Sequence, residues 1–75
     1  MNYDGRITGW IIAELRRQKG MTQEVLSGLA GIARSHLAEI EIGSVNANVD
    51  TLWRIAEALR MKLSELIGKV EERTI

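Results

Sequence analysis

Hydrophobic residues recur along this chain at the spacing of helices rather than strands. No alternation with a period of two persists, and β-branched residues occur singly or in pairs, so no segment is typical of a strand. The first helical pattern covers about residues 6–19, with Thr8, Ile12 and Leu15 on one face, and Gly20 is a suitable left-handed stop. The pattern predicts an all-α protein.

Two short helices are predicted next, in close succession. The first covers about residues 22–30, because Thr22 is a good N-cap and Glu24 suits the positive end of the helix dipole. It must end at Gly31, and the second helix covers about residues 33–42. The positions expected to be buried are Leu26, Leu29, Ala30, Leu37 and Ile40. Two helices of about nine residues, joined around one glycine, make a tight helix–turn–helix.

The last part of the chain carries an uninterrupted helical pattern. Asn48 can cap a helix that starts near Val49, and no Gly or Pro occurs within residues 49–67. Apolar residues follow one another at intervals of four and three, namely Leu52, Ala56, Leu59, Leu63, Leu66 and Val70. Periodicity alone therefore predicts one long helix here.

Length and composition exclude several kinds of site and function. The chain has 75 residues, ten of them basic and ten acidic, with no Cys and one His, which excludes disulfides, thiolate metal sites and a zinc centre. We expect one small domain with no cofactor and no metal. No nucleophile–base set or phosphate-binding glycine loop indicates an enzyme, and no apolar run is long enough for a membrane span. Because the net charge is neutral, a nucleic-acid partner must be argued from where the charges lie. A domain of this size without disulfides or a structural metal often gains stability by oligomerising, which favours an oligomer here.

An ordered set of residues runs through about two-thirds of the chain. It comprises Leu15-Arg16, Gly20-Met21-Thr22-Gln23-Glu24, Leu26, Leu29-Ala30-Gly31-Ile32, Leu37, Ile40-Glu41, Gly43, Leu52, Ile55-Ala56, Ala58-Leu59 and Leu63-Ser64-Glu65-Leu66-Ile67. It resembles the Cro/lambda-repressor-like (XRE-type) helix-turn-helix family, which implies a single domain over residues 1–75, folded as a compact bundle of five short helices.

The resemblance also implies a break near residues 60–62 and a separate C-terminal helix at about 63–71. Arg60 and Lys62 stand where the family usually has a glycine and a small capping residue. The Asn46-x-Asn48 loop further resembles that of the small restriction–modification controller proteins.

The resemblance implies which side chains meet DNA. Gln23 is expected to hold a phosphate and to brace the recognition helix. That helix, over residues 33–42, is expected to enter the major groove with Arg34 at a guanine. Glu39 would either accept from a cytosine amino group or repel phosphates, and Asn48 is either a phosphate donor or occupied as a cap. The expected DNA-binding residues are Gln23, Arg34, Ser35, His36, Ala38, Glu39, Ser44, Asn46, Lys19 and Arg17, while Arg16 and Glu41 form a structural ion pair. The plainer alternatives are an exposed helix-start residue for Gln23 and a solvated cation for Arg34.

Together these features predict a sequence-specific transcriptional regulator in the cytoplasm, associated with the nucleoid, that binds double-stranded DNA as a homodimer on a near-palindromic operator. It would repress by occluding a promoter, or act by contacting RNA polymerase. The expected dimer interface is the C-terminal helix, alone or with the Trp10 edge, through Leu63, Leu66, Ile67 and Val70.

The alternative is an antitoxin-type protein-interaction module on the same scaffold, whose main partner is a toxin. Excess apolar surface fits both functions, and it is expected at Ile7, Trp10, Ile11, Trp53, Val70 and Ile75. A membrane partner is not expected.

Overall fold

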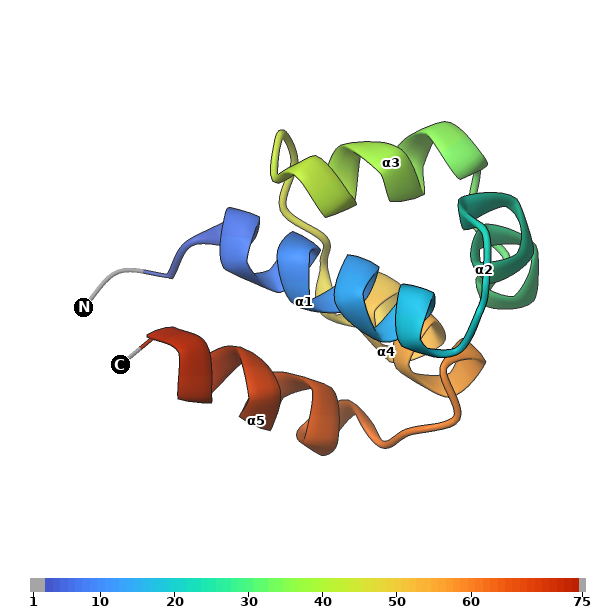
Figure 1. Cartoon of the computed structure of the whole chain (residues 1–75). Coiled ribbons are helices and arrows are strands. Elements are labelled where there is room, and N and C mark those ends of the chain that lie inside the picture. Colours follow the sequence, from blue (N-terminus) through green and yellow to red (C-terminus); the bar gives the residue numbers. More distant parts are fainter. Residues whose placement is uncertain (1–2, 75) are drawn as a thin grey trace.

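The computed structural model describes residues 3–74, and in that range it contains five helices and no strand (Figure 1). They are α1 (Gly5–Gln18), α2 (Gln23–Ala30), α3 (Arg34–Ile42), α4 (Val49–Ala58) and α5 (Leu63–Thr74). In Figure 1, α1 runs through the middle, with α3 on one side of it and α5 on the opposite side. The all-α prediction and the five-helix bundle are confirmed, although α5 continues past residue 71. None of these helices is long and apolar enough to cross a membrane.

Local sequence determines most of the helix ends. Thr22 caps α2 by accepting a hydrogen bond from the backbone N–H three residues further on, at 3.1 Å, and Asn48 caps α4 in the same way at 2.8 Å. Gly31 and Gly43 end α2 and α3 in the left-handed conformation, with φ of 71° and 79°. The start of α3 has no side-chain cap, because the residue that precedes it is Ala33.

A break separates α4 from α5, so the single helix predicted by periodicity is wrong and the break implied by the resemblance is present. Arg60 has a φ of 59°, the left-handed conformation that favours glycine. The Met61 N–H donates to the Ala56 carbonyl oxygen at 3.0 Å, which is the closing hydrogen bond of a Schellman motif. Glu65 then accepts from the Lys62 N–H at 2.9 Å, the returning half of a capping box. Glu65 is therefore the local signal for the start of α5.

One hydrophobic core lies between the helices, and its fully buried large side chains are Ile12, Leu26, Leu37, Ile40, Ile55, Leu59 and Leu66. Leu29, expected to be buried, is 62% exposed because it lies on the outer side of α2. Leu66 and Val70 are buried within the protomer, since α5 packs against α1 and α4, so their assignment to a dimer interface is wrong. Ile11 is also a core residue rather than surface, and Ile75 lies outside the described residues.

The backbones of α1 and α3 come into direct contact at Gly9. A Cβ at this position would lie 2.6 Å from the Glu41 carbonyl oxygen and closer still to that of Ile40. Only glycine permits so close an approach, because it has no Cβ. The contact holds α3 firmly against α1 and leaves its opposite face open to solvent.

Candidate nucleic-acid interface

The open face of α3 is mainly polar and has one large apolar residue. The inward residues are Leu37, Ile40 and Glu41. The helical period places on the opposite face Ser35, Ala38, Glu39 and Ile42. Ile42 is 72% exposed, and it is absent from the expected DNA-binding set although its spacing from Ser35 and Glu39 places it there. It offers the kind of apolar contact that thymine methyl groups accept. His36 is half-buried at the edge, with Nδ1 4.0 Å from Glu39 Oε1.

Beneath this face, polar side chains from α1, α2 and α3 meet at one carboxylate. Arg16 donates from Nε to Glu41 Oε2 at 2.8 Å and from Nη2 to Oε1 at 3.1 Å. Its Nη1 donates to the Met21 carbonyl oxygen at 2.8 Å, which fixes the turn before α2. Gln23 donates from Nε2 to Glu41 Oε1 at 2.9 Å. Arg16 and Glu41 therefore pair as the resemblance implied, and Gln23, which the resemblance expected to brace the recognition helix, does so by donating to Glu41 of α3.

A hollow of about 520 Å³ opens where α2 and α3 both begin, and it is lined by Arg16, Met21, Thr22, Gln23, Glu24 and Arg34. It brings together Gln23 and Arg34, which come from different helices. Backbone N–H groups without intrahelical partners occur at helix starts, where the helix dipole is positive. Among the charged side chains of the lining, Arg16 is paired with Glu41, and Arg34 offsets Glu24. The hollow therefore suits a phosphate group mainly through Arg34 and the N–H groups of the two helix starts.

Two further expected cations lie beside this hollow. Arg17 is in the last turn of α1 and Lys19 is its C-cap, and both are exposed. Neither lines the hollow. They add positive charge near the start of α2 and suit long-range attraction of DNA better than a fixed contact.

The loop from α3 to α4 offers fewer hydrogen-bond donors than expected. Ser44 donates its hydroxyl hydrogen to the Glu39 carbonyl oxygen at 3.2 Å, at the end of α3. Asn48 caps α4 by accepting through Oδ1; the cap does not use its side-chain N–H donors, so the two roles expected for it are compatible. Asn46 is exposed and lies against the first turn of α1, where its Oδ1 would overlap a Cβ at Gly5.

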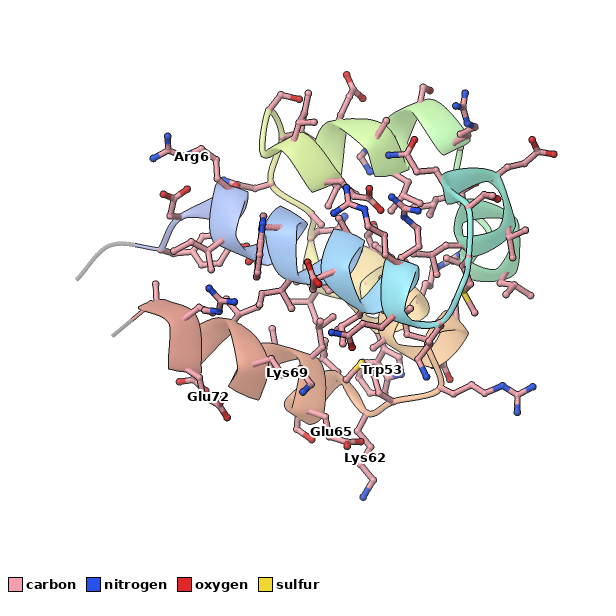
Figure 2. All side chains as sticks on the ribbon, viewed as in Figure 1. Arg6, Trp53, Lys62, Glu65, Lys69 and Glu72 are labelled. Atoms are coloured by element: carbon pink, nitrogen blue, oxygen red, sulfur yellow. The ribbon has the colours of Figure 1, made fainter. Side chains whose placement is uncertain are left out.

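Arg6 lies beside this loop and is absent from the expected set. A Cβ at Gly43 would overlap the backbone and the aliphatic stem of Arg6, whose side chain is 78% exposed and extends outward from the start of α1 (Figure 2). Its Nε donates to Asp4 Oδ1 at 3.1 Å and its Nη2 to Oδ2 at 2.9 Å. The hydrogen bonds from the Arg6 side chain and backbone lower the pKa of the Asp4 carboxyl below its ordinary value. No local pattern indicates this neighbourhood, because it depends on how α1 packs against α3.

Exposed apolar side chains also occur on α4. Val49 and Trp53, one turn apart, are 66% and 55% exposed. Arg54 and Ala58 line a hollow shared with α2, so Val49 and Trp53 lie on the other side of α4, toward α5.

The matching side of α5 carries partly buried apolar residues. Lys69, Glu72 and Arg73 face α1 across a groove of about 350 Å³, where the Arg73 guanidinium lies 4.2 Å from the centroid of the Trp10 ring. Leu63 and Ile67 therefore lie on the side toward α4. The α4–α5 strip, as we call it, consists of Val49, Trp53, Leu63 and Ile67.

Comparison of the sequence with known proteins finds helix-turn-helix regulators and repressors. The sequence profile of the helix-turn-helix family matches residues 12–66. The chain is 36% identical over 67 residues to the uncharacterized HTH-type transcriptional regulator y4dJ of Sinorhizobium fredii, covering 89% of this chain and 87% of that regulator. It is 34% identical over 61 residues to the immunity repressor protein of Bacillus phage phi105, which covers 81% of this chain but only 42% of the repressor.

Solved structures of similar fold include restriction–modification controller proteins. C.AhdI from Aeromonas hydrophila superposes with a TM-score of 0.81 and 35% identity, covering 84% of this chain and 96% of the controller. Wild-type C.Esp1396I superposes with a TM-score of 0.88 over 100% of this chain and 96% of its own, at 23% identity, which supports the fold alone.

Proposed function

The chain belongs to the helix-turn-helix family of DNA-binding transcriptional regulators, a non-enzymatic family, and from this premise we propose that it binds a near-palindromic operator as a symmetric dimer. In this proposal α3 of each protomer enters the major groove of one half-site, and the two half-sites lie about 34 Å apart. Binding over a promoter represses transcription by occluding it, in the cytoplasm and at the nucleoid.

The observation that carries this proposal is the hollow that joins the starts of α2 and α3 at the edge of the open face of α3. Gln23 donates one hydrogen of its side-chain amide to Glu41, and the second hydrogen of the same Nε2 is free to be donated to a phosphate oxygen. Arg34 reaches from the first turn of α3 toward a guanine, where its guanidinium can donate two parallel hydrogen bonds. A phosphate in the hollow therefore sets the depth at which Arg34 meets the bases.

The remaining expected residues take smaller roles. Ser35, Ala38 and Glu39 face the base edges, with Glu39 suited to a cytosine amino group, and His36 lies toward the phosphates. Arg17 and Lys19 attract DNA of every sequence equally, and Asn46 lies beside the sugar–phosphate backbone of the DNA. We assign no phosphate contact to Ser44, because its hydroxyl hydrogen is used at the end of α3.

We place the dimer interface on the α4–α5 strip. A two-fold axis brings the same patch of both protomers together, so Val49 and Trp53 of one copy would pack against those of the other, with Leu63 and Ile67 at the margin. Large exposed apolar side chains gathered between two helices support an interface, and a domain of this size gains stability from a partner.

The test combines DNA binding with oligomeric state. We expect the protein to shift DNA from upstream of its own gene in a salt-dependent manner, and to sediment as a dimer at micromolar concentration. Trp53→Glu should give a monomer, whereas Trp10→Glu, a matched change on the α1–α5 groove, should leave the dimer intact. The reverse pattern would move the interface to the Trp10 edge. Absence of DNA binding at low salt, with tight binding to a neighbouring gene product, would indicate the antitoxin instead.

A further inference from the structure

The segment that follows α3 carries no cationic side chain of its own. Residues 43–48 read Gly-Ser-Val-Asn-Ala-Asn, and the hydroxyl hydrogen of Ser44 is already used at the end of α3. The structure brings Arg6 to this place from α1, because its stem packs on Gly43. One exposed cation therefore stands beside the C-terminal end of the helix proposed to read DNA.

The distance between the two ends of α3 fits the duplex. α3 has nine residues, so its ends lie about 13 Å apart at about 1.5 Å per residue. The major groove of B-DNA is about 12 Å wide between its phosphate walls. In the proposed complex α3 crosses the groove, so a helix held at one phosphate wall through the hollow at its start has its other end near the opposite wall, on the side where the stem of Arg6 packs on Gly43.

The geometry of the Asp4–Arg6 pair leaves Arg6 able to bind an anion. Asp4 accepts from Nε and Nη2, which are two of the five N–H donors of a guanidinium. The remaining donors include both of Nη1, and the side chain is 78% exposed. Asp4 also caps α1 through the Arg6 backbone N–H at 2.9 Å, so its carboxylate is fixed beside the guanidinium.

We propose that Arg6 forms a second phosphodiester-binding point, at the C-terminal end of α3, and that the carboxylate of Asp4 limits its strength. This inference rests on the proposed DNA-binding function. Arg6 donates from its free edge to a phosphate oxygen, while the neighbouring negative charge of Asp4 opposes the approach of the phosphate. The recognition helix is then held at both ends, through Gln23 at its start and Arg6 at its end.

The competing explanation for Arg6 is purely structural. A cation beside the C-terminal end of α3 also complements the negative end of that helix dipole, and it pairs with the cap of α1. Such a role predicts a loss of stability when the charge is removed, with no change in the number of phosphates contacted. The two explanations are separated by the salt dependence of DNA binding.

The test compares Arg6→Gln and Asp4→Asn with Lys69→Gln and Glu72→Gln, which remove the same charges from α5, on the side of the molecule away from α3 (Figure 2). Asparagine is as good an N-cap as aspartate, so Asp4→Asn keeps the cap of α1 while removing its charge. Affinity for the upstream DNA is measured by fluorescence anisotropy over a series of salt concentrations. Folding of each variant is checked by its thermal unfolding curve, and Arg6→Lys provides a variant that retains the charge.

We expect Arg6→Gln to weaken binding about tenfold per protomer and to reduce the slope of log affinity against log salt by about 0.9 per protomer. The loss should be equal on all base variants of the site. Arg6→Lys should keep the slope, and Asp4→Asn should raise affinity severalfold, less so in the Arg6→Gln background.

Two results would overturn the inference. If Arg6→Gln has the salt slope of Lys69→Gln, Arg6 is a structural residue, whether or not its stability falls, and the proposed function still stands. If Asp4→Asn weakens binding, the carboxylate orients Arg6 rather than limiting it, and the second half of the inference is wrong. Absence of any binding by the unaltered protein would overturn the proposed function as well.

Discussion

The close approach of α1 and α3 at Gly9 allows a quantitative prediction for Gly9→Ala. The new Cβ would lie 2.6 Å from the Glu41 carbonyl oxygen and closer still to that of Ile40, whereas ordinary contact begins near 3.4 Å, so α1 and α3 must separate by more than about 0.8 Å. The neighbouring atoms belong to the backbone of α3 and cannot rotate away. Overpacking of this kind costs about 3 kcal/mol, and the better helix propensity of alanine returns about 1 kcal/mol.

The expected net loss is therefore about 2 kcal/mol in the free energy of unfolding. For a domain of this size it corresponds to a fall in Tm of about 8–16 °C. The measurement is thermal and urea unfolding followed by far-ultraviolet circular dichroism. Because the Arg16–Glu41 pair spans the same two helices, part of the loss should appear as weakening of that pair.

Gly68→Ala provides the matched control. Gly68 is inside α5, and a Cβ there would meet no heavy atom within 4 Å. This change should stabilise the protein by about 0.5–1 kcal/mol, from helix propensity alone. If Gly9→Ala proves as stable as the unaltered protein, the reasoning about the α1–α3 contact is refuted.

Three other changes test separate parts of the structure. Arg60→Gly should raise the free energy of unfolding by about 0.5–1 kcal/mol, because relief of the left-handed strain exceeds the added chain entropy; an unchanged urea midpoint would contradict this. Gln23→Ala should cost about 1 kcal/mol of stability, and more in an Arg16→Met background, because Gln23 is then the remaining side-chain donor to the buried Glu41 carboxylate; additive losses would contradict the network. Arg34→Ala should weaken binding to the cognate site by about 1–3 kcal/mol, with little loss on a site whose guanine is already replaced. A loss that is equal on every base variant would make Arg34 a phosphate contact.

Much of the fold could be predicted from the sequence, because helix ends depend on neighbours only a few residues away. Thr22 and Asn48 form the caps predicted for them, and Gly31 ends α2 as expected. The family resemblance correctly implied that α4 and α5 are separate. Periodicity missed that break because a regular apolar pattern is equally compatible with one helix or two, and the signal for a new helix was the single carboxylate of Glu65.

The site could be predicted less completely, because its residues come together only through packing. Gln23 bonds to Glu41 from a different helix, and Arg6 reaches Gly43 only because α1 crosses α3 without intervening side chains. Ile42 is exposed despite being apolar, since it points away from the single core.

The sequence by itself determined which segments are helices and where most of them begin and end, since capping and turn geometry are local. Tertiary structure decided which apolar residues are surface and which are core. Leu66 and Val70 have the same apolar character as Ile67, but the direction in which α5 returns across α1 and α4 buries the first two and leaves the third at the edge. That direction is set by the packing of all five helices around one core, which no local pattern specifies.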